Sequence, residues 1–470
     1  MLWLALYLPA LPLEVHTRGQ AQDTPLAVLE QGRVLLANEP TVRPGLGRNA
    51  ALALSPELQL KVRDGRAEAD ALARLSDWAL QFSSWVSPEP PDTLLLEAGG
   101  SLRLFGGAQR FQERVHRELR ELGYQGRLAL APTPRGAWLL ARAGLEGLYT
   151  GEADFQAALR RVPCEVLAPD GRCLQAMRDL GLRDLGDCLA LPRGGLRRRL
   201  GAALGERLDQ AQGLRPEPRK TWQSPPRFHS RLELPTEVEH CGQLVFALGR
   251  LLRELSGALR GRDAALQHYE LALEHPQGEA TRLGVGLLRP ARDPAHLLAL
   301  GQERLERLRL RAPVRAVRLR CDDIRPWEGE TASLLEQHAR QGDADWRPLA
   351  ERLSVRLGTS AVRGLSTVDE HRPEKAWRHT DVGQGLGRGR PQRPLWLLEQ
   401  PLALHQRGQQ PLWHGPLRLE RGPERIESGW WDGEDQRRDY YQAVNPAGAR
   451  LWVFQERAPE RRWYLHGFFS

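Results

Sequence analysis

The stretch LWLALYLPALPLEV (residues 2–15) opens the chain with apolar residues and holds no acid before Glu14. Further short apolar runs follow it, separated by longer amphipathic segments. Alternation of this kind predicts an α/β unit, and we expect 2–15 to form its first strand. The helices of the unit are expected to cover one face of a mixed sheet.

This pattern continues to about residue 160. We expect further strands at 34–38, 93–98, 101–105 and 127–132. We expect helices at 69–82, 108–122 and 135–144. The α/β unit is therefore predicted to span residues 1–160.

Length and composition predict a globular protein of several domains. The chain has 470 residues, 41% hydrophobic and 27% charged, which is too long for a single core. Lys+Arg exceed Asp+Glu by 67 to 59, and the basic residues are almost all arginines. Guanidinium groups bind phosphate well, which favours a nucleic-acid partner, although a GC-rich genome would produce the same bias.

The cysteines predict neither a disulfide framework nor a zinc site. They are odd in number, scattered and without a CxxC pair, which suits a reducing cytoplasm. No apolar run reaches the roughly 18 residues of a membrane span, so we expect a soluble protein. We also expect no bound metal or cofactor. The five are Cys164, Cys173, Cys188, Cys241 and Cys321.

Residues 161–219 are predicted to be helical. The segment AMRDLGLRDLGDCLALPRGGLRRRLG (176–201) holds short amphipathic helices around glycine turns, and helix N-termini at such turns can bind a phosphate backbone. The alternative is an ordinary helical hairpin with a solvated basic face. The candidate DNA-binding residues here are Arg183, Arg193, Arg197, Arg198 and Arg199.

A proline-containing linker at 220–228 leads to a predicted βαββαβ region, 229–327. Its last strand places Arg315, Arg318 and Arg320 on one face and Val or Leu on the other. Such a basic sheet face can lie along a duplex, or it can be merely solvated.

The composition changes after Trp327. Residues 328–393 read as a polar connector with one helix within 346–370 and a Gly/Arg-rich linker at 380–393. Residues 394–470 predict a small, aromatic-rich β domain. Its aromatic residues could stack on bases, but we favour a core role with one edge left for a protein partner. They are Trp430, Trp431, Tyr440, Tyr441, Trp463 and Tyr464.

Three segments in this order resemble motifs of the Y-family translesion DNA polymerases: VRPGLGRNAALAL (42–54), LALAPTPRGAWLLA (128–141) and MRDLGLRDLGDCLALP (177–192). The resemblance implies palm and fingers at 1–160, a helix-hairpin-helix thumb at 161–219 and a little finger at 229–327. The tail motifs GPERIESGWWDG (422–433) and RRWYLHGFFS (461–470) are similar to the ImuB branch of that family, polymerase-like proteins of bacterial DNA-damage mutagenesis cassettes.

The departures from the family pattern bear on catalysis. Active members carry Asp-x-Asp on the first strand, where this chain is expected to place Leu6 and Leu8. Their second carboxylate pair would fall at Leu95, Leu96 and Glu97, which leaves one acid. Because two-metal phosphoryl transfer needs several carboxylates, the resemblance implies a polymerase fold without polymerase activity.

The resemblance also implies three protein partners besides DNA: the sliding clamp, a RecA-like cassette protein and an error-prone C-family polymerase. Clamp binding uses a Gln-x-x-Leu-Phe type of peptide. Gln409, Leu412 and Trp413 fit that spacing, and Leu334 with Leu335 offers a second candidate. Both patterns can arise by chance, and Leu412–Trp413 could instead begin a core strand.

Three functions remain in competition. The leading hypothesis is a non-catalytic scaffold in damage-induced translesion synthesis. The second is an active Y-family polymerase with a rearranged metal site, which the missing carboxylate pairs disfavour. The third is a stand-alone DNA-binding module of repair.

Overall fold

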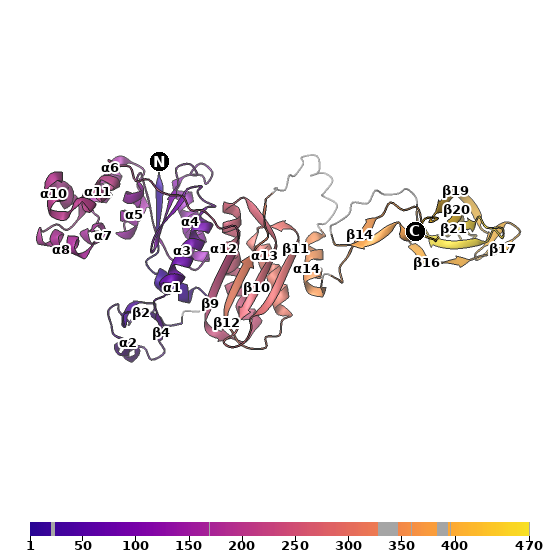
Figure 1. Ribbon diagram of the computed structural model, residues 1–470, viewed down its shortest axis with the longest axis horizontal. Helices are drawn as coiled ribbons and strands as arrows, with labels where there is room; N and C mark the ends of the chain where they lie inside the picture. The colour runs from indigo at the N-terminus through magenta and orange to yellow at the C-terminus, as the bar shows by residue number, and fades with distance from the viewer. Residues whose placement is uncertain are drawn as a thin grey trace. The chain divides into compact units, whose positions relative to one another are not determined.

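The computed structural model describes residues 1–19, 24–168, 170–327, 346–358, 360–382, 393–394 and 396–469 (Figure 1). The chain forms two compact units, a first unit from Met1 to Trp346 and a second unit from Arg347 to Ser470. The finer six-part division expected from the sequence stays a prediction. None of the helices in these ranges is both long and apolar enough to cross a bilayer.

The first unit begins with a five-stranded sheet of strand order β5-β6-β1-β7-β8. Its strands are β1 Trp3–Tyr7, β5 Val86–Glu89, β6 Thr93–Glu97, β7 Arg127–Ala131 and β8 Gly147–Leu148. The central strand β1 runs antiparallel to both β6 and β7. The expected strands at 93–98 and 127–132 are confirmed.

Two expectations for this region are wrong. The first strand ends at Tyr7, and Leu11–Thr17 form helix α1, because Pro12 in the first helical turn is compatible with a helix start. Residues 101–105 form turns and not a strand. Glycines precede and follow that segment, and Leu104 points to solvent, so its alternating pattern does not mark a sheet.

Helices cover both faces of the sheet, which corrects the expectation of one covered face. Helices α3 (Gly65–Ala79) and α4 (Ala108–Glu121) pack on the face that carries Leu4, Leu6 and Leu96. Helix α5 (Pro134–Arg142) packs on the opposite face, against Trp3, Ala5 and Leu95. The strands are apolar on both sides, and such strands require cover on both sides.

A separate three-stranded sheet, of order β3-β2-β4, has its own small core. Its elements are β2 Leu26–Glu30, β3 Arg33–Ala37, β4 Gln59–Val62 and helix α2 Arg48–Leu54. The strand expected at 34–38 is confirmed as β3, shifted by one residue.

The helical region follows as expected. Asp184 caps α9 by accepting a hydrogen bond from the Asp187 backbone N–H at 3.0 Å, and Gly181 turns the chain with φ +74°. The helices are α6 Glu152–Arg160, α7 Cys164–Leu167, α8 Gly171–Asp179, α9 Leu185–Ala190, α10 Arg193–Leu200 and α11 Ala202–Ala211.

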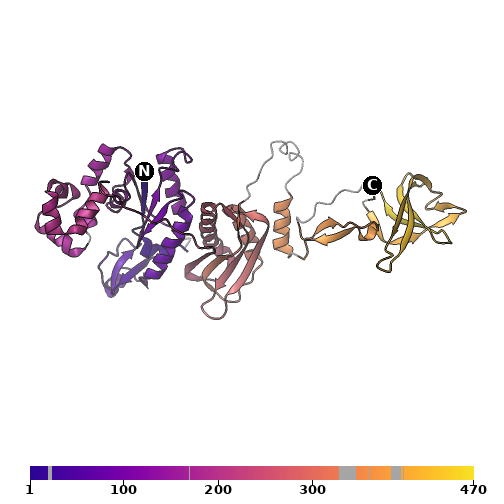
Figure 2. The ribbon, with the colours of Figure 1, turned by 45° about the horizontal axis from the view of Figure 1, so that its top comes forward.

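The expected βαββαβ order is also confirmed (Figure 2). Its sheet has the order β11-β10-β12-β9, and the short strand β13 (Ile324–Pro326) pairs with β10. The elements are β9 Phe228–Val238, α12 Leu244–Gly261, β10 Ala264–Glu274, β11 Thr281–Ala291, α13 Pro294–Glu306 and β12 Val314–Cys321.

A buried ion pair joins this βαββαβ region to the N-terminal sheet. Arg18, directly after α1, pairs with Glu254 of α12, and the two residues are only 3% and 1% exposed. Arg18 also donates to the Tyr124 hydroxyl at 2.5 Å, and the Ser230 hydroxyl of β9 donates to Glu254 at 2.6 Å. Beside this pair, Gly257 leaves room for Trp78 of α3, where a Cβ would come within 2.4 Å of the indole ring.

The second unit contains the expected helix, α14 (Arg347–Leu357), and the expected β domain. The domain is a five-stranded antiparallel sheet of order β16-β22-β21-β20-β19. Its strands are β16 Trp396–Ala403, β19 Arg418–Ser428, β20 Gln436–Val444, β21 Arg450–Glu456 and β22 Trp463–Phe468. Two hairpins were not expected: β14 Gly364–Thr367 with β15 Trp377–Thr380, and β17 His405–Arg407 with β18 Gln410–Leu412.

The buried ion pair generates a stability prediction. Glu254→Ala leaves the Arg18 guanidinium buried without its carboxylate, and we expect a loss of about 3–5 kcal/mol in the free energy of unfolding. The measurement is denaturant unfolding of the full chain. Glu118→Ala is the control because its pair with Arg114 on α4 lies nearer the surface, and its loss should stay below about 1 kcal/mol. Equal losses for the two variants would contradict the structural role of the pair.

Candidate functional site

The positions expected to replace the catalytic acids lie on two different faces of the sheet. Leu6, Leu8 and Leu96 are fully buried beneath the helices that cover one face. Glu97 belongs to the other face, where it accepts hydrogen bonds from the backbone N–H groups of Gly99 at 3.1 Å and Gly100 at 3.3 Å. Glu97 therefore orders the turn after β6, and the position-by-position equivalence with active enzymes stays a prediction.

An acid that sequence reasoning missed lies where β1 ends. Tyr7 of β1 pairs with Thr93 of β6, so Asp92 comes opposite Leu8, and its carbonyl accepts the Leu8 N–H at 2.8 Å. Arg142 of α5 forms an ion pair with the Asp92 carboxylate at 2.5 Å and lies over the Tyr7 ring, 4.5 Å from its centroid. A guanidinium thus neutralises this carboxylate. The signal for Asp92 was the Pro-Pro-Asp turn directly before the apolar strand.

Further carboxylates near α5 are also bound by arginines. Arg135 of α5 contacts Glu89 at 3.4 Å and Glu217 at 2.5 Å, and Arg219 pairs with both glutamates. Among the described residues, no group of three His, Cys, Asp or Glu side chains is arranged to hold a metal ion. These contacts stabilise the packing of the 217–219 segment on α5.

The basic residues predicted in the helical region are exposed, but they differ in their partners. Arg193 and Arg197 both pair with Asp209 of α11, at 3.1 and 2.7 Å. Arg198 donates to the Gly194 carbonyl within its own helix at 3.4 Å. Arg183, Arg198 and Arg199 have no ion pair within the described part of the chain. The structure therefore brings Arg193 and Arg197 together and leaves Arg198 and Arg199 more available to a phosphate.

The predicted exposure of the β12 arginines is confirmed, but the alternation is broken where Ala316 and Val317 are both buried, beside a register shift between Val314 and Ala316. Arg315, Arg318 and Arg320 are exposed, and the residues between them are buried. Arg318 lies opposite Arg231 of β9 in the register, so guanidinium groups adjoin across the strands.

Acids on this face neutralise part of its charge. Arg318 and Arg231 share Glu274, at 2.5 and 3.0 Å, and Arg320 pairs with Asp322 at 2.7 Å. Sequence alternation could not reveal these cross-strand pairs. Arg315 is exposed and forms no ion pair with a described residue, so it remains available to a phosphate.

Of the two clamp-peptide candidates, one is described. Gln409 is exposed at the turn of the β17–β18 hairpin, while Leu412 and Trp413 are half-buried. Trp413 packs against the core of the β domain that contains Leu417 and Trp463. The tryptophan of this candidate clamp peptide, Trp413, therefore contributes to the core of the β domain. Leu334 and Leu335 lie outside the described residues.

The aromatic residues of the tail divide into two groups. Tyr440 is 1% exposed and stacks on Trp452 at 4.2 Å, and Trp463 is 4% exposed, so the core prediction is confirmed for both. Tyr441 and Tyr464 are half-buried. The core prediction is wrong for Trp430 and Trp431, which are 76% and 57% exposed because they belong to the turn after β19.

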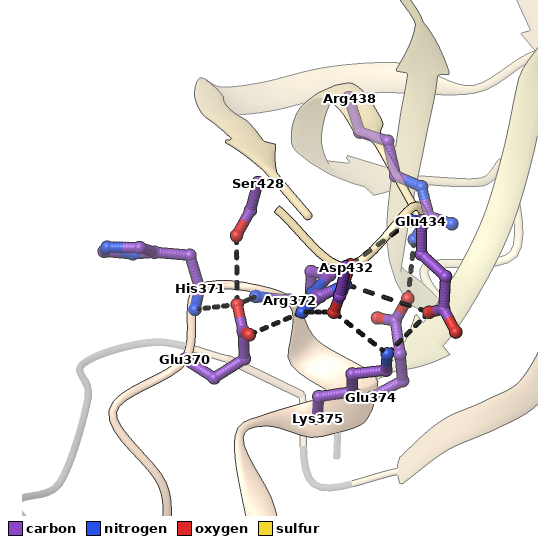
Figure 3. A network of polar contacts seen from close by, with 9 residues as sticks. All are labelled: Glu370, His371, Arg372, Glu374, Lys375, Ser428, Asp432, Glu434 and Arg438. Carbon is purple, nitrogen blue, oxygen red and sulfur yellow. Dashed lines mark hydrogen bonds and ion pairs between the residues drawn. The ribbon is translucent and has the colours of Figure 1, made fainter. Parts of the chain in front are cut away.

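A polar network in the second unit holds this turn in place (Figure 3). Arg372, itself buried, donates two hydrogen bonds to Asp432 at 3.0 and 2.6 Å and one to Glu370 at 2.8 Å. The hydrogen bonds from Arg372 lower the pKa of Asp432 to about 2. Lys375 adds an ion pair with Glu434 at 2.6 Å. The two exposed tryptophans are therefore carried on an anchored turn, which sequence reasoning missed.

Two relatives match this chain in sequence over most of its length. The chain is 30% identical over 466 residues to Protein ImuB of two strains of Caulobacter vibrioides, covering 91% of this chain and 99% of each relative. No protein-family model matches the chain.

Among solved structures, an insertion ternary complex of Dbh DNA polymerase aligns with 69% of this chain and 100% of its own, at 16% identity and a TM-score of 0.40. DinB from Sulfolobus solfataricus covers the same shares at 15% identity and a TM-score of 0.35.

The described elements follow the order of an α/β sheet, a helical region and a βαββαβ region. The identity and coverage of the two relatives are high enough to show the family. The chain belongs to the ImuB family.

Proposed function

We propose that this chain is a non-catalytic polymerase-like scaffold that binds DNA in damage-induced translesion synthesis and mutagenesis. It links the sliding clamp, a RecA-like accessory protein and an error-prone C-family polymerase that carries out the synthesis. The observation that supports this proposal best is the end of β1, where Asp92 is paired with Arg142.

The reasoning on catalysis starts from what polymerisation requires. Two Mg²⁺ ions must be held by shared carboxylates, and they stabilise the transition state by several kcal/mol. Leucines at positions 6, 8 and 96 provide no ligand. Asp92 would have to give up its guanidinium partner before it could bind a cation, so we infer that the chain does not polymerise DNA.

The reasoning on DNA binding starts from charge. Exposed arginines of α10 and the arginine-rich face of β12 can contact phosphates without reading bases. Such contacts release counterions, so the affinity should fall steeply with salt and depend little on sequence. If the chain binds DNA but does not catalyse synthesis, its function is to recruit other proteins to that DNA.

The DNA-binding proposal is tested on α10. Arg198→Ala/Arg199→Ala should weaken binding to primer-template DNA of any sequence and reduce the slope of log K against log salt by about 1 for each phosphate that is no longer bound. The measurement is fluorescence anisotropy across a salt series.

The matched control is Arg178→Ala in the same helical region, whose guanidinium is paired with Glu165 at 3.2 Å. It should change neither quantity appreciably. An unchanged affinity and slope for the double variant would exclude α10 from the DNA contact.

The clamp proposal is tested at the exposed end of the β17–β18 hairpin. Gln409→Ala removes the predicted hydrogen-bonding side chain without disturbing the core, and we expect about tenfold weaker capture of a purified sliding clamp. Gln406→Ala on the paired strand β17 is the control and should capture the clamp normally. Equal capture by both variants would remove this hairpin as the clamp site.

A further inference from the structure

The first unit contains an open cavity of about 970 Å³ beside helix α1. Helices α4 and α12 and the turn at residues 123–127 also line it. Its volume lies in the range of small-molecule sites. Pro9 and Ala10, which follow β1, line the cavity, but Tyr7, Asp92 and Arg142 do not, so the Asp92–Arg142 pair is not part of it.

The cavity wall has an excess of positive charge. Arg120, Arg127 and Arg250 line it, and none of the three forms an ion pair with a described residue. Arg18 lines it as well, but Glu254 balances its charge. The remaining titratable side chains of the wall are His116, Tyr124, Glu14 and Glu146.

Arg250 shows the imbalance most clearly. Its guanidinium is half-buried, donates to the Arg18 backbone carbonyl and lies over Phe246, 4.2 Å from the ring centroid. Burial and the neighbouring charges of Arg18 and Arg253 lower the pKa of Arg250 to about 10. Removing a cation from water without a counter-ion is costly, and Arg250 lines the cavity without an ion pair to a described residue.

The backbone is adapted to this guanidinium. Gly123 has φ +85°, and a Cβ at that position would come within 2.7 Å of the Arg250 guanidinium carbon. A side chain there would be strained and would displace the guanidinium. The turn at 123–127 is therefore shaped to let Arg250 reach the cavity.

Glu14 does not cancel the charge. Its Oε1 accepts the Gln125 backbone N–H at 2.7 Å, while its Oε2 is buried without a hydrogen-bond partner. Burial raises the pKa of Glu14 to about 7, so a substantial fraction is neutral at neutral pH. A protonated carboxyl group can donate a hydrogen bond to an anion.

We propose that this cavity is a binding site for a phosphate-bearing ligand, held by Arg120, Arg127 and Arg250. Three guanidinium groups around one cavity suit the several oxygens of a phosphate or polyphosphate, which they bind bidentately. The phosphate belongs either to a free nucleotide or to the end of a nucleic-acid strand. This inference does not rest on the proposed scaffold function.

Isothermal titration of the full chain tests the site with pyrophosphate, ATP and an oligonucleotide with or without a 5′-phosphate. Arg120→Ala/Arg127→Ala, both exposed, should weaken binding of the phosphate probe at least tenfold. Arg110→Ala/Arg160→Ala removes the same charge away from the cavity and should stay within twofold. Arg198→Ala/Arg199→Ala should leave this binding intact even if it weakens DNA binding.

The two sources give different results. A free nucleotide is the ligand if pyrophosphate and ATP bind and lose affinity in the cavity variant. A strand end is the ligand if only the 5′-phosphorylated oligonucleotide shows that loss. The proposal is overturned if the intact chain binds no probe at millimolar concentration, or if the cavity and control variants lose affinity equally.

Discussion

The buried ion pair between Arg18 and Glu254 fixes the arrangement of the first unit. A guanidinium at 3% exposure requires its carboxylate, and Glu254 in turn requires the donors that Arg18 and Ser230 supply. Arg18 follows α1, Ser230 belongs to β9 and Glu254 to α12, so one desolvated contact holds the N-terminal sheet and the βαββαβ region together. The cavity beside α1 adjoins this contact, since Arg18 and Tyr124 line it together with Arg250 of α12.

Arginines bind the carboxylates that lie near the first sheet and α5. Arg142 pairs with Asp92, and Arg135 and Arg219 bind Glu89 and Glu217. A site built for Mg²⁺ would leave carboxylates open to the ion, because a metal and a guanidinium compete for the same oxygens. The same residue type, exposed on α10 and β12, supplies the attraction for phosphate. Arginine side chains therefore support both parts of the proposed function: the lack of catalysis, because they occupy carboxylates, and DNA binding, because they attract phosphates.

Structural features that follow from a local sequence pattern could be predicted from the sequence. Features that depend on contacts between distant segments could not. The exposed arginines and buried apolar residues of β12 and the order of the βαββαβ region follow from local pattern, and both are confirmed. The pairing of Arg193 and Arg197 with Asp209 required α11 to fold back on α10. The Pro-Pro-Asp turn marked Asp92 in the sequence, but its position opposite Leu8 depends on the register of β1 with β6. The exposure of Trp430 depends on a turn that Arg372 anchors from another segment.

Primer extension on a primed template, with Mg²⁺ and separately with Mn²⁺, tests the central claim most directly. The same preparation must bind that DNA in a parallel assay, so that a lack of extension reflects chemistry and not misfolding. The account predicts binding with no nucleotide added to the primer. Nucleotide addition that depends on the metal and disappears in Asp92→Ala would show that this carboxylate leaves Arg142 to hold a metal, and would contradict the account.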